Sequence, residues 1–496
     1  MDGLFLGIDC GTQGTKALIL DAGSGAVLGQ GSAAHAPPRG EHGCREQDPA
    51  DWLRALREAV ADALTAAGVG GREIRALAVS GQQHGLVLLD AQGQVLRPAK
   101  LWCDTQTRSE NDELLAALGG ASGSLERLGL VIAPGYTLSK LLWTRRHHPE
   151  LFARAAHLLL PHDYLNHWLT GRACSEPGDA SGTGYYDVRN RAWATDVLEL
   201  VEPGPRLAAA LPQLVESGQC IGLLRAQAAE ALGLPAGIAV ASGGGDNMLG
   251  AIGTGNITPG TLTLSLGTSG TLAAHLDQAQ ISPCAEVATF CSSSGGWLPL
   301  ICTMNLTGAC ALVQALLDLD LDTFAELAAR SPIGAEGLLL LPFFDGERVP
   351  ALPDASASLL GMTSANLTPA NLCRAVLEGT CFSLRHGLDL LRDVGLISQE
   401  IRLVGGAAKS PLWRQTLADL LGVPLVCPHH TEAAALGAAL QAAWSLGRER
   451  GEGDTLQALC ARCVTLDEST RTLPRPASQA AFEVAYQRYR AHLPGQ

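Results

Sequence analysis

Residues 9–15 read DCGTQGT, and the phrase returns in the second half of the chain as SLGTSGT at residues 265–271. Each copy lies between two apolar runs that are typical of β-strands, which predicts a hairpin with a glycine-rich turn. Glycine reaches positive φ and lets the backbone approach a ligand closely, so consecutive N–H groups and threonine hydroxyls can surround an anion. Two such turns predict two lobes that hold a polyphosphate from opposite sides. Only the first copy carries an acid, Asp9.

The length and charge of the chain limit the class of protein. A chain of 496 residues exceeds one hydrophobic core, and we expect two domains, residues 1–246 and 247–496. The formal net charge of −14 argues against nucleic acid and anionic membranes as partners. We expect neither a signal peptide nor a membrane span. The 14 cysteines are scattered through apolar segments, which fits reduced thiols in a cytoplasmic protein.

Strand-like and helix-like segments alternate almost throughout, which predicts an α/β architecture. Asp48–Pro49 is typical of an N-cap followed by the first residue of a helix, and a buried strand is expected over residues 74–79. In the second half, Thr368–Pro369 predicts the start of a long helix, and a strand is expected over residues 401–404.

Asp246 is the strongest candidate for catalysis. It follows a predicted strand over residues 237–241 and three glycines, the place where α/β sheets present reactive side chains. A carboxylate here can accept the proton of a hydroxyl as that oxygen attacks phosphorus. It can equally be the N-cap of the helix that follows. The position alone leaves both interpretations open.

Asp9 is the second acid of interest, at the end of the first strand and just before the turn. A carboxylate close to polyphosphate oxygens is repelled unless Mg²⁺ lies between them. The alternative is an Asx-turn that stabilises the hairpin. The glycine-threonine context favours the metal.

Two further loops follow predicted strands. Gln83 and His84 can make directional hydrogen bonds to neutral hydroxyls, as a polyol pocket requires, although a lone histidine is more often structural. Gly405 and Gly406 can let a flat base or a ribose lie against the backbone, although glycine pairs at strand ends are common. The chain has no GxxxxGK[ST] loop, and no GxGxxG motif opens the first βα turn, which disfavours P-loop NTPases and dinucleotide enzymes.

The ordered set of motifs resembles the FGGY family of carbohydrate kinases, within the actin-like ATPase superfamily. The phrases that carry the resemblance are IDCGTQGTKALI, EQDPADW, SGQQHG, LWCD, LLPHDYL, GDASGTGYYDV, ASGGGDN, LSLGTSGTL, GERVP, LVGGAAKS and EAAALGAA. They follow the family's order over nearly the whole chain. The resemblance implies an α/β fold of two actin-like (ribonuclease H-like) ATPase domains flanking a cleft, with ATP and Mg²⁺ as cofactors.

The resemblance also implies roles for individual residues. Asp246 is the implied general base, and Asp9 the acid that positions Mg²⁺, mostly through water. Gln83, His84 and Asn247 are the implied sugar contacts, together with Asp246. The residues implied to bind ATP are Thr12, Gly14, Gly267, Thr268, Ser269, Gly405, Gly406 and Lys409.

The implied activity is ATP-dependent phosphorylation of D-xylulose to D-xylulose 5-phosphate. The alternatives are another ketose or polyol, such as ribulose, gluconate or glycerol, and a sugar-independent actin-like ATPase. The glutamine-histidine pair argues against glycerol. The stretch after Asp104 and residues 349–352 depart from the family's pattern, which leaves the preferred sugar open. The expected partners are a small-molecule sugar and ATP, and a homodimer is compatible with this prediction.

Overall fold

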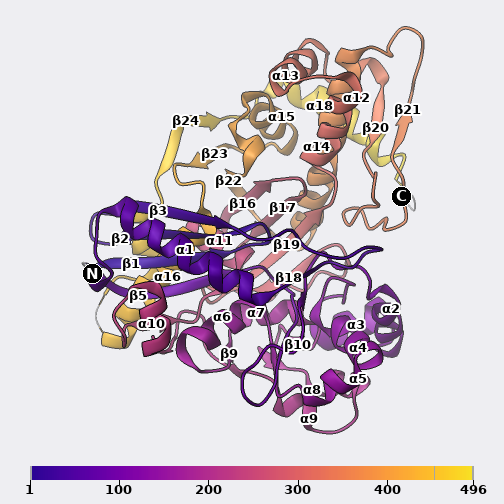
Figure 1. The fold of residues 1–496 in the computed structure, drawn as a ribbon. Coiled ribbons are helices and arrows are strands. Elements are labelled where there is room, and N and C mark those ends of the chain that lie inside the picture. The colour runs from indigo at the N-terminus through magenta and orange to yellow at the C-terminus, as the bar shows by residue number, and fades with distance from the viewer. Residues whose placement is uncertain (1–2, 452, 494–496) are drawn as a thin grey trace.

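Two seven-stranded mixed sheets organise the chain, one in each lobe (Figure 1). The computed structural model describes residues 3–451 and 453–493. The strands of the first sheet are β1 (Leu4–Cys10), β2 (Gly14–Asp21), β3 (Ala26–Ala34), β5 (Ile74–Gly81), β13 (Cys220–Leu223), β14 (Ala239–Ala241) and β15 (Gly244–Gly245). Those of the second sheet are β16 (Gly260–Leu266), β17 (Gly270–Ala274), β18 (Ala288–Cys291), β19 (Trp297–Thr303), β22 (Ser398–Val404), β23 (Leu425–Pro428) and β24 (Leu466–Thr472).

Both sheets contain the same arrangement of five strands. The order β3-β2-β1-β5-β14 in the first sheet corresponds to β19-β17-β16-β22-β23 in the second. In each, the middle strand of the first three is antiparallel to both of its neighbours, and the last two strands continue in parallel with the third. This repeat confirms the predicted α/β fold of two ribonuclease H-like lobes, and it extends far beyond the repeated glycine-threonine phrase.

Short strand pairs and helices surround the sheets. The pairs are β4 (Glu46–Gln47) with β7 (Ala99–Lys100), β6 (Val87–Leu89) with β8 (His157–Leu159), β9 (Cys174–Ser175) with β12 (Gln213–Leu214), β10 (Tyr186–Asp187) with β11 (Ala192–Trp193), and β20 (Leu339–Leu341) with β21 (Ser358–Leu360). The helices before residue 246 are α1 (Pro49–Ala67), α2 (Arg108–Ala117), α3 (Gly120–Leu128), α4 (Thr137–His147), α5 (Pro149–Arg154), α6 (Pro161–Thr170), α7 (Pro177–Ala180), α8 (Thr195–Val201), α9 (Arg206–Ala209) and α10 (Ala226–Leu232). The later helices are α11 (Asp246–Gly253), α12 (Thr307–Leu317), α13 (Leu321–Arg330), α14 (Pro369–Asp393), α15 (Pro411–Leu421), α16 (Ala433–Arg450), α17 (Leu456–Cys463) and α18 (Pro476–Arg490). Within the described ranges, no helix has the length and apolarity that a membrane crossing requires.

The predicted helix starts at Asp48 and Thr368 are confirmed. The Asp48 carboxylate accepts a hydrogen bond from the amide of Ala50 at 2.9 Å, and helix α1 begins at the following proline. The Thr368 hydroxyl accepts from the amide of Asn371 at 3.2 Å, and α14 again begins with proline. Both caps satisfy an amide that the first turn of the helix leaves without a partner.

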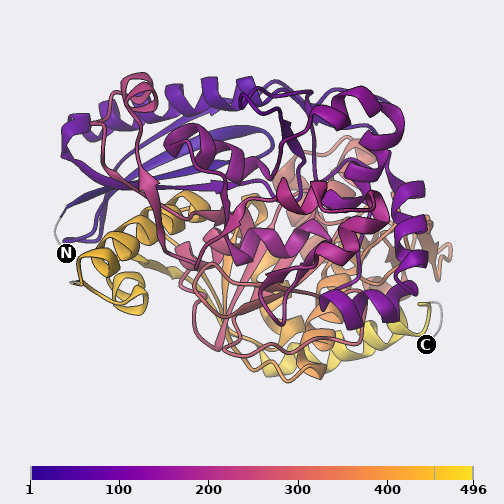
Figure 2. The same ribbon diagram turned by 90° about the horizontal axis from the view of Figure 1, so that it is seen from below.

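Helix α16 lies between β23 and β24 of the second sheet in sequence but packs against β1 and β5 of the first, and Figure 2 shows it beside the indigo strands. Glycine makes this close approach possible. A Cβ on Gly7 of β1 would lie 1.9 Å from the carbonyl oxygen of Ala435. Where α16 crosses α11, a Cβ on Gly437 would lie 1.8 Å from the carbonyl oxygen of Leu249. The two lobes are therefore joined at backbone-to-backbone contacts that no other residue permits.

Candidate active site

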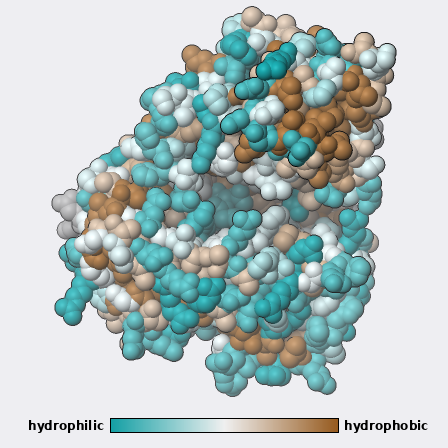
Figure 3. Space-filling model, turned by 45° about the horizontal axis from the view of Figure 1, so that its top comes forward, coloured by the Kyte–Doolittle hydropathy of each residue, from teal (hydrophilic) through white to brown (hydrophobic). Residues whose placement is uncertain are grey.

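The functional candidates gather at one edge of each sheet, and Figure 3 shows a hollow between the two lobes. In the first sheet, β1 pairs in parallel with β5 and β15 pairs in parallel with β5, so the three strands end at the same edge. That edge carries the first glycine-threonine turn, the Gln83–His84 loop and Asp246. In the second sheet, the parallel pair β16 and β22 places the second turn beside Gly405.

The two glycine-threonine turns differ by one residue in strand register. In the first, Cys10 pairs with Thr15, and the amide of Gly11 donates to the carbonyl of Gly14 at 3.1 Å. In the second, Leu266 pairs with Gly270, so that one residue fewer lies between the paired positions. The repeated sequence therefore forms two related hairpins with different loop geometry.

The first turn is held by side chains from three other segments. The indole Nε1 of Trp102 donates to the Thr12 hydroxyl at 2.9 Å, and this hydroxyl donates to Oε1 of Gln82 at 3.2 Å. The side-chain amide of Gln47 donates to the carbonyl of Thr12 at 2.9 Å. Thr12 is thus fixed in place by the first lobe, and Trp102, which the sequence showed only as part of the LWCD phrase, is one of the residues that hold it.

The second turn is supported by the start of α12. The Thr307 hydroxyl donates to the carbonyl of Gly267 at 2.7 Å, and the side chain of Thr268 stays exposed. Beside this turn, Gly405 has φ 94°, and a Cβ there would lie 2.4 Å from the carbonyl of Leu266. Position 405 therefore requires glycine for two independent reasons.

The remaining residues that sequence reasoning assigned to ATP lie near these two turns. A Cβ on Gly14 would lie 2.6 Å from the carbonyl of Ala33, so β3 approaches this glycine closely. Gly406 faces open space, and Lys409 is exposed at the end of the short 3₁₀ helix over residues 406–409. Ser269 is half-buried in the second turn.

Asp9 is half-buried and accepts a hydrogen bond at Oδ1 from the Ser80 hydroxyl at 2.9 Å. Burial raises the pKa of Asp9 to about 6, against the opposing effects of Ser80 and of the nearby Lys16 ammonium. Lys16 itself forms an ion pair with Glu432, the residue before α16, at 2.5 Å. Asp9 therefore bonds to a neighbouring strand rather than to its own turn, which does not support the Asx-turn interpretation.

Asp246 is the first residue of α11, and its N-cap is Gly245. Its Oδ1 accepts hydrogen bonds from the backbone amide of Asn247 at 2.8 Å and from the side-chain amide of the same residue at 3.1 Å. Burial, followed by the negative charge of Asp9, raises the pKa of Asp246 to about 7. A carboxylate with such a pKa can take up a proton near neutral pH.

Buried polar side chains lie next to Asp246. The side-chain amide of Asn247 donates to Oε1 of Gln83 at 2.9 Å, which joins the two loops. Nε2 of Gln83 and Nδ1 of His84 are buried and have no hydrogen-bond partner among the described residues. Buried polar atoms are nearly always satisfied in a folded protein, so Nε2 of Gln83 indicates a place for a polar ligand, whereas Nδ1 of His84 lies against the backbone of Gly182.

Aromatic rings pack beside His84 and form a wall next to these polar side chains. The centroid of the His84 ring lies 4.7 Å from that of Tyr136 and 5.8 Å from that of Phe290. Burial and the positive charges of Lys140 and Arg348 lower the pKa of His84 to about 3, so the imidazole is neutral at physiological pH. Neither Tyr136 nor Phe290 lies in a motif that predicts a site, and Arg348 was visible only as part of the GERVP phrase.

Two other clusters of side chains that can bind metals lie among the described residues. Cys44, Glu46 and Asp104 lie together, but the Lys100 ammonium is 3.1 Å from Glu46 and 3.0 Å from Asp104. The lysine therefore already supplies the positive charge in this group.

The second group is a buried ionic network. His162 lies 3.0 Å from Asp179 and 3.2 Å from Asp163, and its other nitrogen is 2.7 Å from the carbonyl of Ser242. Contact with both carboxylates raises the pKa of His162 well above its ordinary value. A protonated imidazole donates at both nitrogens and cannot bind a metal, so this group supports the loop that precedes Asp246.

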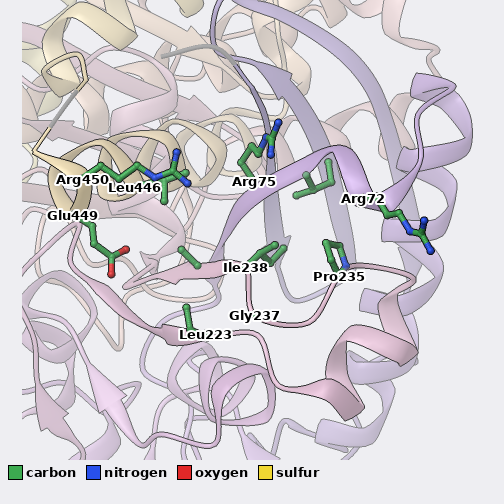
Figure 4. A pocket seen from close by; sticks show the side chains of 11 residues that line it. Arg72, Arg75, Leu223, Pro235, Gly237, Ile238, Leu446, Glu449 and Arg450 are labelled. Carbon is green, nitrogen blue, oxygen red and sulfur yellow. The ribbon is translucent and has the colours of Figure 1, made fainter.

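A cavity of about 400 Å³ lies away from the cleft, at the opposite edge of the first sheet (Figure 4). It is lined by Ile74, at the start of β5, and by the last turn of α16. Figure 4 shows that the guanidinium groups of Arg72, Arg75 and Arg450 do not point toward a common centre. The cavity therefore lacks the convergent polar groups of a ligand site.

Two family models together match most of the chain. The N-terminal domain of the FGGY family of carbohydrate kinases matches residues 4–253, and the C-terminal domain of the same family matches residues 262–446. The first match contains the first glycine-threonine turn and Asp246, and the second match contains the second turn.

Similar proteins of known name and structure agree with these matches. The chain is 46% identical to a xylulose kinase of Haemophilus influenzae, with 99% of each chain covered. It is 40% identical to a xylulose kinase of Streptomyces coelicolor, over 90% of this chain and 89% of that one. The crystal structure of xylulose kinase from Bifidobacterium adolescentis superimposes with a TM-score of 0.85 at 34% identity, covering 99% of each chain. The chain therefore belongs to the FGGY family of carbohydrate kinases.

Proposed function

We propose that the protein transfers the γ-phosphoryl group of ATP to the 5-hydroxyl of D-xylulose and releases D-xylulose 5-phosphate. The observation that carries the proposal is the hydrogen-bonded chain from Asp246 through Asn247 to Gln83. It joins a carboxylate of raised pKa to a buried side-chain amide whose Nε2 has no partner among the described residues, beside a phosphate-type turn. D-xylulose is chosen as the sugar because the similar proteins are named xylulose kinases.

Asp246 acts as the general base in this proposal. Its pKa of about 7 lets a large share of the molecules hold a carboxylate at neutral pH, which accepts the hydroxyl proton as the oxygen attacks phosphorus. Gln83, His84 and Asn247 bind the sugar hydroxyls and orient the reacting one. Phosphoryl transfer passes through a loose transition state, so positioning and charge stabilisation supply most of the catalysis.

Asp9 is the residue we propose to hold Mg²⁺, mostly through water. An oxygen donor that is half-buried beside a phosphate-type turn has the chemistry this ion prefers. When bound, the ion would neutralise charge on the β- and γ-phosphates. Lys16 and Glu432 neutralise each other next to Asp9, which leaves its carboxylate as the net negative group there.

We assign the nucleotide to the two turns and to the second lobe. Amides and hydroxyls of Thr12, Gly14, Gly267, Thr268 and Ser269 would contact phosphates. Gly405 and Gly406 would let the adenosine lie against the backbone, with Lys409 at the exposed rim. In this assignment residues 1–246 contain the sugar pocket and the first turn, and residues 247–496 contain the nucleotide site. A cytoplasmic location and a homodimer stay predictions from the sequence.

The experiment that tests the function is ADP release in the presence of ATP and Mg²⁺ with a panel of D-xylulose, ribulose, gluconate and glycerol. A kcat/KM for D-xylulose at least about tenfold above that of every other sugar would support the proposal. A preference for another sugar would replace D-xylulose within the same mechanism. ADP release that is equally fast with and without sugar would make the protein a sugar-independent ATPase.

A further inference from the structure

Lys140 of α4 is fully buried and has an unusual set of partners. Its ammonium donates hydrogen bonds to the backbone carbonyls of His84 at 2.6 Å and of Gly135 at 2.5 Å. No described carboxylate lies within ion-pair distance, and the nearby Asp104 is paired with Lys100 at 3.0 Å. Burial lowers the pKa of Lys140 to about 7. A buried ammonium without a carboxylate costs free energy, so its retention requires a reason.

The two carbonyls belong to the two loops that form the aromatic wall of the sugar pocket. His84 supplies one ring of this wall, and Gly135 directly precedes Tyr136, which supplies the ring next to it at 4.7 Å. One ammonium therefore links the backbones of both loops directly behind the wall.

The backbone of His84 has a conformation that needs such support. Its φ of 63° is left-handed, which a residue with a Cβ adopts at a cost. The carbonyl of His84 receives a second hydrogen bond from the Thr137 hydroxyl at 3.2 Å. Two donors on one carbonyl fix the orientation of this peptide group, and with it the direction of the imidazole.

We propose that Lys140 is a positioning residue for the sugar, because its ammonium holds the His84 and Gly135 backbones in the arrangement that the bound sugar requires. The inference rests on the proposed function. Asp246, Asp9 and the two turns lie on other elements, so loss of Lys140 weakens sugar binding more than the chemical step. A residue that served stability alone would not separate these two quantities.

The test compares Lys140→Met, which keeps an unbranched side chain one atom shorter and removes its charge and donors, with the wild-type protein. The expected result is a KM for D-xylulose that rises at least about tenfold, with kcat lowered by less than about threefold. Quenching of tryptophan fluorescence by D-xylulose, measured without ATP, gives the Kd and should weaken by a similar factor. The matched control is Thr144→Val, which removes a buried hydroxyl that donates along the same helix to the carbonyl of Lys140, and it should leave KM and kcat unchanged.

Thr137→Val covers the case in which Lys140→Met does not fold, as judged by a lost thermal transition. This variant removes only the second donor to His84 and should raise the KM by about two- to fivefold. If the Lys140→Met protein folds, a KM and a Kd within twofold of the wild-type values would overturn the inference. If it does not fold, an unchanged KM in Thr137→Val would overturn it. Wild-type protein without xylulose-dependent ADP release would overturn the proposed function instead.

Discussion

The side-chain amide of Asn247 lies 2.9 Å from Oε1 of Gln83 and 3.1 Å from Oδ1 of Asp246. One amide thus connects the loop after β5 with the first turn of α11. The Asp246 carboxylate and the Gln83 side chain are therefore parts of one hydrogen-bonded unit, and a shift of either loop changes the distance between them.

Asp246→Asn should lower kcat by roughly 10²–10⁴, the usual effect of a lost general base. Folding should persist, because the Asn side-chain oxygen can still accept the hydrogen bond that Asp246 receives from the amide of Asn247 at 2.8 Å. ADP release coupled to a spectrophotometric assay measures the change. An unchanged kcat would remove Asp246 from the role of base.

The pH dependence of kcat/KM should follow the pKa of Asp246 in the free protein. A base works only when deprotonated, so the rate should fall about tenfold per unit as pH drops below about 7 and level off above it. The charge of Asp9 contributes to this raised pKa, so Asp9→Asn should move the acid limb to lower pH. A flat profile between pH 5 and pH 8 would contradict this assignment.

The same raised pKa predicts an effect on stability. The pKa of Asp246 is about 7 in the folded protein and near 3.8 when unfolded, so the charged form destabilises the fold. The penalty is complete above pH 7 and disappears as the pH falls toward 3.8. Asp246→Asn should therefore increase the free energy of unfolding at pH 8 by on the order of 1 kcal/mol, allowing for partial exposure of the side chain. Thermal melting at pH 8 and pH 4.5 measures it, and an equal shift at both values would point to another cause.

Asp9→Asn should raise the Mg²⁺ concentration needed for half-maximal activity by about 10–100-fold, as is usual for residues that bind a metal through water. The Ser80 hydroxyl can still donate to the Asn side-chain oxygen, so the strand pair should stay intact. Titration of ADP release with Mg²⁺ at fixed ATP gives the value. Metal dependence equal to that of the wild-type protein would count against the site.

Gly437→Ala should lower the free energy of unfolding by about 3 kcal/mol, because the new methyl group would lie 1.8 Å from the carbonyl of Leu249. Gly250→Ala on α11 is the control, since a Cβ there meets nothing within 4 Å. This control should be neutral or stabilising by up to about 1 kcal/mol. Urea unfolding compares the two variants, and equal losses would show that the helix crossing tolerates a side chain.

Local patterns predicted the parts of the molecule that depend on neighbouring residues. The two hairpins, the helix starts at Asp48 and Thr368, and the place of Asp246 after a strand and three glycines all follow from turn and cap chemistry. The parallel pairing of β1 with β5 then accounts for the meeting of Asp9 and Gln83 at one edge.

Contacts between distant segments could not be predicted in this way. The hydrogen bond from Trp102 to Thr12 joins residues 90 positions apart, and no periodicity indicates it. The packing of α16 on the first sheet depends on Gly7 and Gly437, which in sequence are only two of 57 glycines. In the sequence, Lys140 looks like an ordinary charged residue of a helix, and only the fold shows that it is buried. Such features depend on how distant segments pack together, and local sequence patterns do not indicate this packing.

The glycine contacts between α11 and α16 also determine how the cleft can change. Main-chain atoms touch at Gly437, so rearranging side chains cannot absorb a sliding movement of one helix along the other. Asp246 begins α11, less than one helical turn from Leu249, so it lies close to this fixed contact. A change in the width of the cleft that keeps the contact would therefore leave Asp246 nearly in place.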